Sequence, residues 1–181
     1  MNVLLSGGCK NGKTGFAQDI AVLLSGGEKH YYVATMIPYD SEDRARIKRH
    51  IDDRAGMGFS TLEVPRDIAS CLTLAKPDAT FLVDSVTALL LNELFPATHN
   101  GDADPDAVNR CRDGLLKLAA GAKNAVFVTD YLYSDAIRYD GFTENYRASL
   151  AALDQALAEI CDVVIELCAG NVIFHKGGLS E

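Results

Sequence analysis

The chain has 181 residues, of which 48% are hydrophobic, and its formal net charge is −8 at pH 7. This length predicts one domain, residues 1–181, with a sizeable core. The pI near 4.9 and the lack of clustered Lys and Arg argue against a nucleic-acid partner. We expect a cytoplasmic protein without a leader or membrane segment, because the longest apolar stretch, Thr80–Leu91, contains Asp84 and is too short to cross a bilayer.

Strand-like and helix-like segments alternate along the N-terminal half of the chain. Apolar runs predict strands at Asn2–Ser6, His30–Ala34, Phe59–Val64 and Thr80–Val83. Amphipathic stretches predict helices at Lys13–Ser25, Ser41–Asp53, Asp67–Leu74 and Val86–Glu93. Ser41 is the expected cap of the second helix, with acids in its first turn, and Ile47 and Ile51 are expected to face the core.

The C-terminal half continues the alternation and ends in a hairpin. The sequence predicts a surface loop at Pro96–Pro105, a helix capped by Asp104-Pro105 that lasts to about Ala120, a strand at Ala125–Thr129, a helix at Thr143–Glu159, and an antiparallel hairpin of Cys161–Cys168 and Asn171–His175. This order predicts an α/β fold with an open, mainly parallel sheet and helices on both faces. Ligands bind such sheets at the carboxyl ends of the strands.

A phosphate-binding motif follows the first strand. Residues 7–14 read G-G-C-K-N-G-K-T and complete the pattern G-x-x-x-x-G-K-[ST]. The glycines allow backbone N–H groups to face a triphosphate, Lys13 reaches the outer phosphates, and the Thr14 hydroxyl can join a Mg²⁺ shell. We therefore predict a P-loop NTPase with a nucleotide site at Gly7, Gly8, Cys9, Lys10, Asn11, Gly12, Lys13 and Thr14. A Gly-rich turn without function is the plainer alternative, which the strand–motif–helix context disfavours.

Asp84 is the candidate acid beside the phosphates. It ends the apolar run Phe81-Leu82-Val83, so its carboxylate belongs at the sheet edge where the phosphate loop lies. We predict that Asp84 serves Mg²⁺ or the nucleotide together with Thr14. The alternative is an N-cap of the helix that follows.

His50 lies on one face of the predicted helix Ser41–Asp53, together with Arg46 and Asp53. Such a charged face is more often solvated than functional. However, a histidine flanked by cations stays neutral, and neutral imidazole can attack phosphorus.

Four segments in order resemble one protein family. They are GGCKNGKT at 7–14, YYVAT at 31–35, DSEDRARIKRHIDDR at 40–54 and FSTLEVPRDI at 59–68, and LVDSVTALLLNELF at 82–95 adds to the likeness. The chain resembles the bifunctional adenosylcobinamide kinase/adenosylcobinamide-phosphate guanylyltransferases of cobalamin assembly. That family carries a phosphate loop, a Y-[IV]-A-T strand, an R-I-x-x-H-[RK] helix and a T-x-E-x-P segment. The likeness is good over residues 2–95 and thin afterwards.

The resemblance implies a fold, two activities and a set of contacts. It implies a RecA-like domain that assembles as a trimer, with nucleotides (GTP, ATP or both) and corrinoids as its small-molecule partners. It implies phosphorylation of adenosylcobinamide, followed by GMP transfer from GTP through His50 as the guanylylated nucleophile. It also implies guanine-nucleotide contacts at Thr35, Met36, Ile37, Ile51, Asp52, Asp53, Arg54, Glu63 and Asp84.

The C-terminal half departs from the family pattern. Where the family reads N-E-V-G, this chain has Asp130-Tyr131-Leu132-Tyr133, and Ala148 stands where the acid of F-R-D belongs. Asp154-Gln155 resembles the family's N-Q. The missing Glu leaves open a small-molecule kinase with a different acceptor. A nucleotide-binding regulatory module without transfer is a second alternative, and a nucleic-acid-acting ATPase is disfavoured by the acidic charge.

Overall fold

The structure, a computed structural model, describes residues 1–76, 78–96 and 103–179. One sheet has the strand order β3-β2-β4-β5-β1-β6-β7. The strands are β1 Asn2–Gly7, β2 His30–Ala34, β3 Ser60–Glu63, β4 Thr80–Asp84, β5 Asn124–Val128, β6 Val163–Cys168 and β7 Asn171–Lys176. All pairs are parallel except β6–β7, which is antiparallel. The predicted mainly parallel sheet with a C-terminal hairpin is confirmed.

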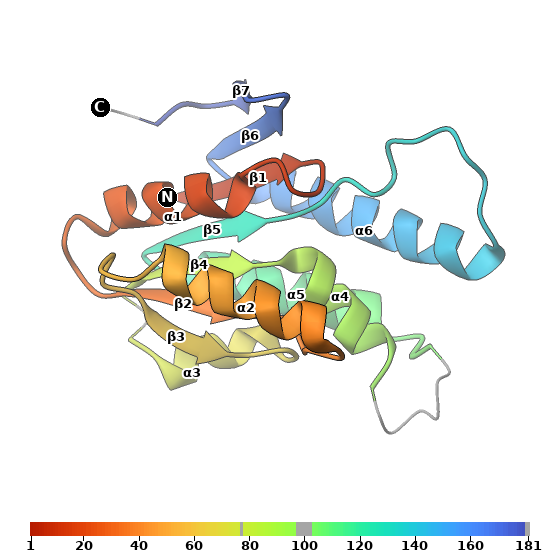
Figure 1. The fold of residues 1–181 in the computed structure, drawn as a ribbon, viewed down its shortest axis with the longest axis horizontal. Helices are drawn as coiled ribbons and strands as arrows, with labels where there is room; N and C mark the ends of the chain where they lie inside the picture. Colours follow the sequence, from red (N-terminus) through yellow and green to blue (C-terminus); the bar gives the residue numbers. More distant parts are fainter. Residues whose placement is uncertain (77, 97–102, 180–181) are drawn as a thin grey trace.

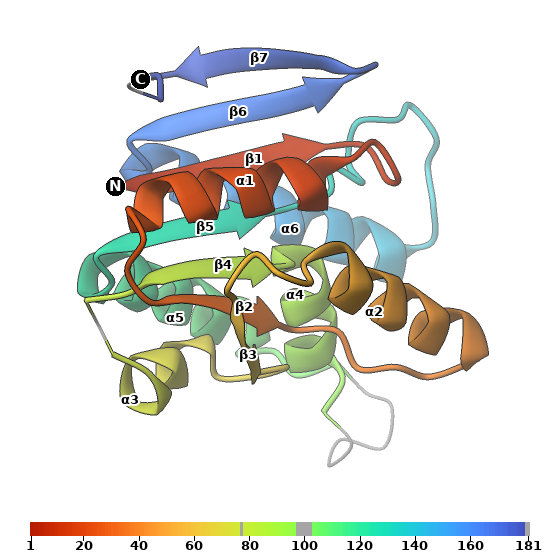
Figure 2. The ribbon, with the colours of Figure 1, turned by 60° about the vertical axis from the view of Figure 1, so that its left-hand side comes forward.

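Helices lie on both faces of this sheet (Figures 1 and 2). They are α1 Lys13–Ser25, α2 Ser41–Asp53, a 3₁₀ turn Ile68–Ser70 leading into α3 Cys71–Leu74, α4 Val86–Leu94, α5 Ala107–Gly121 and α6 Gly141–Ile160. None of the helices within the described residues has the length and apolar character needed to span a membrane. The predicted loop at Pro96–Pro105 falls mostly on residues 97–102, which lie outside the described residues.

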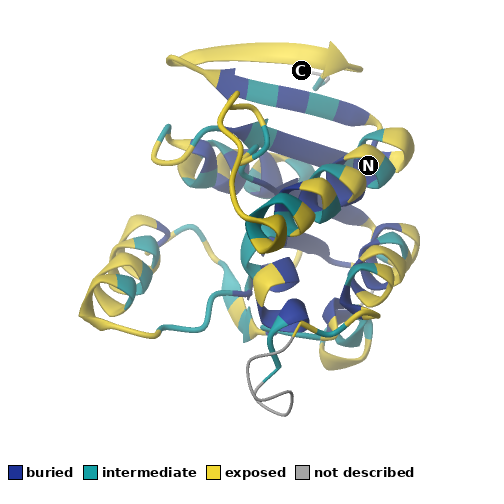
Figure 3. Cartoon of the chain, turned by 90° about the vertical axis from the view of Figure 1, so that its right-hand side faces the viewer, coloured by how far each residue is buried: buried dark blue, intermediate teal, exposed yellow. Residues whose placement is uncertain are grey.

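The central strands are buried on both faces, so successive side chains enter two separate cores. On β4, Leu82 packs with the α1 side of the sheet. Phe81 and Val83 pack with the side covered by α4, α5 and α6. This alternation fixes the register of the sheet, because a shift by one residue would exchange the two cores. The outer strand β7 is different, since all of its residues are exposed (Figure 3).

Helix α2 differs from the prediction in its cap and in its packing. The cap is Asp40, whose carboxylate accepts the N–H of Asp43 at 2.9 Å, and Ser41 is already helical. No residue of α2 is buried, and Ile51 is 49% exposed. The expectation that Ile47 and Ile51 face the core is therefore wrong, because this helix lies against a cleft rather than against the sheet.

Helix α5 begins later than predicted. It starts at Ala107 with Asp106 at the cap position. Asp104 does not cap it: one carboxylate oxygen accepts the Asp106 N–H at 2.9 Å, and the other pairs with Arg110 at 2.8 Å. The turn that precedes the helix uses the Asp104 side chain, so Pro105 lies outside the helix.

A buried carboxyl group lies on α6. Asp154 is 6% exposed, and its Oδ2 accepts the hydroxyls of Tyr133 at 2.8 Å and Thr129 at 3.1 Å. Its Oδ1 has no hydrogen-bond partner among the described residues. Burial raises the pKa of Asp154 to about 6, although the two hydroxyls oppose this shift.

We expect Asp154→Asn to remove a pH-dependent loss of stability. A raised folded-state pKa means that the native state binds the proton more tightly, so native stability falls as pH rises from about 4 to 6. The free energy of unfolding of the variant, relative to that of the unsubstituted chain, should increase by about 2 kcal/mol between pH 4.5 and pH 8. Urea unfolding at both pH values measures this change. Asp113→Asn, at a carboxylate that is 58% exposed, is the matched control. A constant difference between the two proteins at both pH values would contradict the assignment.

Candidate active site

The phosphate-loop segment Gly7–Thr14 joins the end of β1 to the start of α1. Gly12 has a φ of 88° at the cap of α1, a conformation that glycine adopts without strain. Asn11 Nδ2 donates to the backbone carbonyl of Leu167 in β6 at 2.6 Å. A Cβ at Gly7 would lie 2.6 Å from both of these groups. The loop is therefore fitted closely against β6.

Lys13 is buried and fully engaged. Its ammonium group donates to the Gly8 carbonyl, to Asn11 Oδ1 at 3.4 Å and to Asp130 Oδ1 at 2.7 Å. The side chains of Lys13 and Asp130 are 6% and 18% exposed, so this ion pair is shielded from solvent. Two groups of the phosphate loop and one carboxylate from outside it thus surround the Lys13 ammonium group.

Asp84 links the phosphate loop to α2. Its Oδ2 accepts the hydroxyls of Tyr32 at 2.6 Å and Thr14 at 3.1 Å, and lies 3.6 Å from His50 Nδ1. The predicted alternative, Asp84 as a helix cap, is wrong, because Ser85 caps α4 by accepting the N–H of Ala88. The Asp84 carboxylate takes no part in capping α4 and is available to the candidate active site.

The neighbours of the Asp84 carboxylate determine its ionisation state. Burial alone would raise the pKa of Asp84, but the contacts with His50, Tyr32 and Thr14 outweigh it and hold the pKa below its usual value. Burial and the Asp84 charge raise the pKa of the Tyr32 phenol. Tyr32 therefore stays protonated, and its hydroxyl donates a hydrogen bond to Asp84.

Arg54 holds the end of α2 to the sheet. Its guanidinium lies 4.1 Å from the centre of the Tyr32 ring, at cation–π distance. It also donates to the His50 carbonyl at 2.6 Å and to Thr61 Oγ1 at 3.0 Å. Polar contacts of this kind, rather than apolar burial, position His50 above Asp84.

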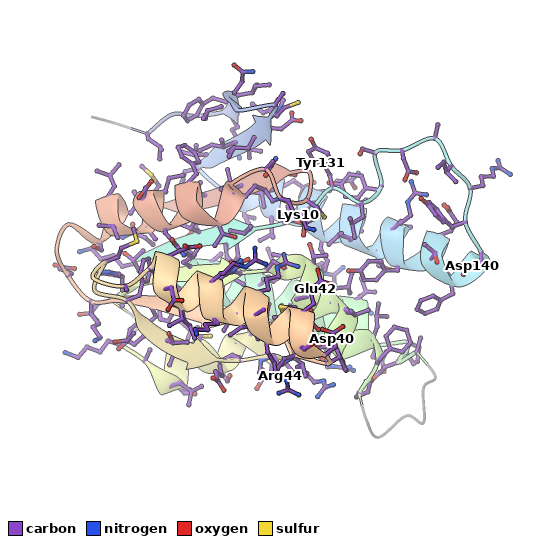
Figure 4. All side chains as sticks on the ribbon, in the orientation of Figure 1. Lys10, Asp40, Glu42, Arg44, Tyr131 and Asp140 are labelled. Carbon is purple, nitrogen blue, oxygen red and sulfur yellow. The ribbon has the colours of Figure 1, made fainter. Side chains whose placement is uncertain are left out.

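A cleft of about 870 Å³ lies between α2, α4 and the carboxyl ends of β2, β3 and β4. Figure 4 shows Arg44 near the amino end of α2, Lys10 on the phosphate loop, and Tyr131 close to that loop. None of the described phosphate-loop residues lines the cleft; Asp84 and Asp130 connect the two, because each lines the cleft and bonds a loop side chain.

The structure brings most of the other predicted residues to this cleft. The ones that line it are Met36, Ile37, His50, Ile51, Arg54, Glu63 and Asp84. Thr35 does not reach it, because its buried hydroxyl donates to the Ser85 carbonyl and accepts the Ser85 N–H. Asp52 and Asp53 are exposed and are not among the lining residues.

Two residues of the site were not predicted from the sequence. Tyr32 projects on the same face as Asp84, because β2 and β4 pair with Ala34 opposite Asp84. The signal for Tyr32 was its place two residues before the end of a strand that adjoins β4. Asp130 was noted only as a departure from a family motif. Its signal was an acid directly after a buried strand at the phosphate-loop edge.

We expect Gly7→Ala to weaken nucleotide binding by about tenfold or more. The added methyl group would collide with the Asn11 side-chain amide and with the backbone carbonyl of Leu167, and because the carbonyl belongs to a paired strand, the loop must shift. Titration of the protein with a fluorescent GTP or ATP analogue measures the affinity. Gly141→Ala is the control, since a Cβ at that position meets no atom within 4 Å. Equal affinities for the two variants would contradict this account of the loop.

Comparisons with known proteins agree with this geometry. A family model described as cobinamide kinase / cobinamide phosphate guanyltransferase matches residues 3–174. No curated protein matches the chain. Among solved structures, one ATPase domain has a TM-score of 0.58 and 15% identity, covering 97% of this chain and 76% of its own. A prototypical ATPase from the type III secretion system of pathogenic bacteria has a TM-score of 0.54 and 14% identity, covering 93% of this chain and 51% of its own. These likenesses confirm the P-loop NTPase fold.

Proposed function

Because the chain belongs to the cobinamide kinase / cobinamide phosphate guanyltransferase family, we propose that it catalyses both reactions of cobalamin nucleotide-loop assembly. The first is phosphorylation of the aminopropanol hydroxyl of adenosylcobinamide. The second is GMP transfer from GTP to adenosylcobinamide phosphate. The observation that carries the proposal is the short chain of contacts from the phosphate loop through Thr14 and Asp84 to His50.

The hydrogen bonds around His50 support one nitrogen as the nucleophile. Tyr32 uses its only hydroxyl hydrogen in the bond to Asp84, so its oxygen can accept a hydrogen bond from His50 Nδ1, which lies 3.4 Å away. A proton on Nδ1 leaves the lone pair on Nε2. In the proposed step Nε2 attacks the α-phosphorus of GTP, pyrophosphate leaves with the bonding electrons, and a His50–GMP phosphoramidate forms. The phosphate of the acceptor then displaces the imidazole.

The donor set beside the phosphate loop fits Mg²⁺. Thr14 Oγ1 and Asp84 Oδ2 are oxygen ligands 3.1 Å apart, of the type that this hard cation prefers. When bound, Mg²⁺ neutralises charge on the phosphate oxygens. Lys13 and the loop N–H groups stabilise the charge that develops on the transferred phosphoryl group.

Product analysis tests the whole proposal. The purified chain is incubated with adenosylcobinamide, Mg²⁺ and GTP or ATP, and the corrinoids are then separated and identified by mass spectrometry. We expect the phosphate product with a suitable donor and the GDP-linked product with GTP. Nucleotide binding without either product would favour the regulatory alternative, and phosphorylation of another alcohol alone would favour the different-acceptor kinase.

We expect His50→Ala to lose covalent labelling. The original chain should retain ³²P from α-labelled GTP after denaturation, because a phosphoramidate survives unfolding at neutral or alkaline pH. His175→Ala, at an exposed histidine paired with Glu166 at 2.8 Å, should label normally. Label retained in His50→Ala would remove His50 from its role.

A further inference from the structure

The contacts of Lys13 set a condition for nucleotide binding. A lysine ammonium has three protons, and here they meet the Gly8 carbonyl, the Asn11 amide oxygen and the Asp130 carboxylate. A phosphate oxygen must replace at least one of these acceptors. Asp130 is the charged one, and a carboxylate next to a polyphosphate of the same sign is repelled. We therefore expect a bound nucleoside triphosphate to displace Asp130 from Lys13.

The released carboxylate cannot move far. Asp130 comes two residues after β5, the strand that lies between β4 and β1. Its backbone N–H donates to Thr87 Oγ1 at 3.0 Å, and the carbonyl of Thr87 accepts the Tyr146 hydroxyl at 3.0 Å. All three of these residues line the cleft. Asp130 is thus held between the phosphate loop and the cleft.

We propose that Asp130 is the general base of the phosphoryl transfer, which rests on the proposed kinase function. In this step the acceptor hydroxyl gives its proton to an Asp130 oxygen, and the hydroxyl oxygen bonds to the γ-phosphorus. The bond between that phosphorus and the bridging oxygen breaks, and its electron pair leaves with the nucleoside diphosphate. A general base at this position implies that the acceptor that binds beside Asp130 is an alcohol.

The second carboxylate at this edge, Asp84, is committed elsewhere. It already accepts from Thr14 and Tyr32 and faces His50. Among the described residues, Lys13 is the only side chain that hydrogen-bonds or pairs with the Asp130 carboxylate. Asp84 therefore belongs to the Thr14 and His50 side of the site, and Asp130 belongs to the Lys13 and acceptor side.

Two substitutions of Asp130 test the role. With adenosylcobinamide, Mg²⁺ and the better phosphoryl donor, Asp130→Asn and Asp130→Ala should lower kcat for phosphorylation by about 100- to 10,000-fold. The Kd for the nucleotide should stay equal or fall, because a competitor of the phosphates is removed from Lys13. Labelling from α-labelled GTP should persist. Added formate should restore part of the activity of Asp130→Ala, where it fits the vacated space, and not that of Asp130→Asn.

Asp19→Asn, at an exposed acid on α1, is the control, and its kcat for phosphorylation and its nucleotide Kd should equal those of the unsubstituted chain. Phosphorylation by Asp130→Asn within a few-fold of the original rate would overturn the proposal. A joint loss of nucleotide binding and labelling in both variants, without formate rescue, would also overturn it and leave Asp130 a structural counter-ion. An original chain that phosphorylates no corrinoid would refute the proposed function, and the base role with it.

Discussion

One oxygen atom, Asp84 Oδ2, organises the candidate site. It accepts one hydrogen bond from Thr14 of the phosphate loop and another from Tyr32 of the sheet, and it faces His50 on α2. The carboxylate is poorly exposed, so its charge must be matched by these neighbours. Because α2 buries no residue of its own, this polar contact and the guanidinium of Arg54 determine where the histidine lies. Without that shared acceptor, the helix would have little reason to approach the sheet.

Parallel pairing explains why two acids, rather than one, meet the phosphate loop. β4 and β5 are neighbours in the sheet, and β1 lies on the other side of β5. Their carboxyl ends reach the same edge, so the residues that follow each strand face the loop that follows β1. One acid engages the loop hydroxyl and the other engages the loop lysine. Thr14 and Lys13 thus each have an acidic partner of their own, which separates the His50 side of the site from the Lys13 side.

Sequence patterns predicted the elements and the loop better than the contacts between them. The helix Lys13–Ser25 was predicted with its observed bounds, because a motif and a Gly-Gly stop mark its ends. The expectation for Ile47 and Ile51 failed because amphipathic spacing does not distinguish a cleft from a core. Tyr32 escaped notice because its role depends on strand register, which no local pattern encodes. The single domain, the trimer, the cytoplasmic location and the roles of the site residues stay predictions.

The bond from Asn11 to Leu167 has a consequence for how the site is made. The motif is complete at Thr14, yet the carbonyl that fixes it belongs to β6, and Asn11 and Leu167 are 156 residues apart in the sequence. During synthesis the loop therefore lacks this support until β6 has emerged. A fragment that stops before β6 would contain every N-terminal motif and still lack the carbonyl against which the loop is fitted.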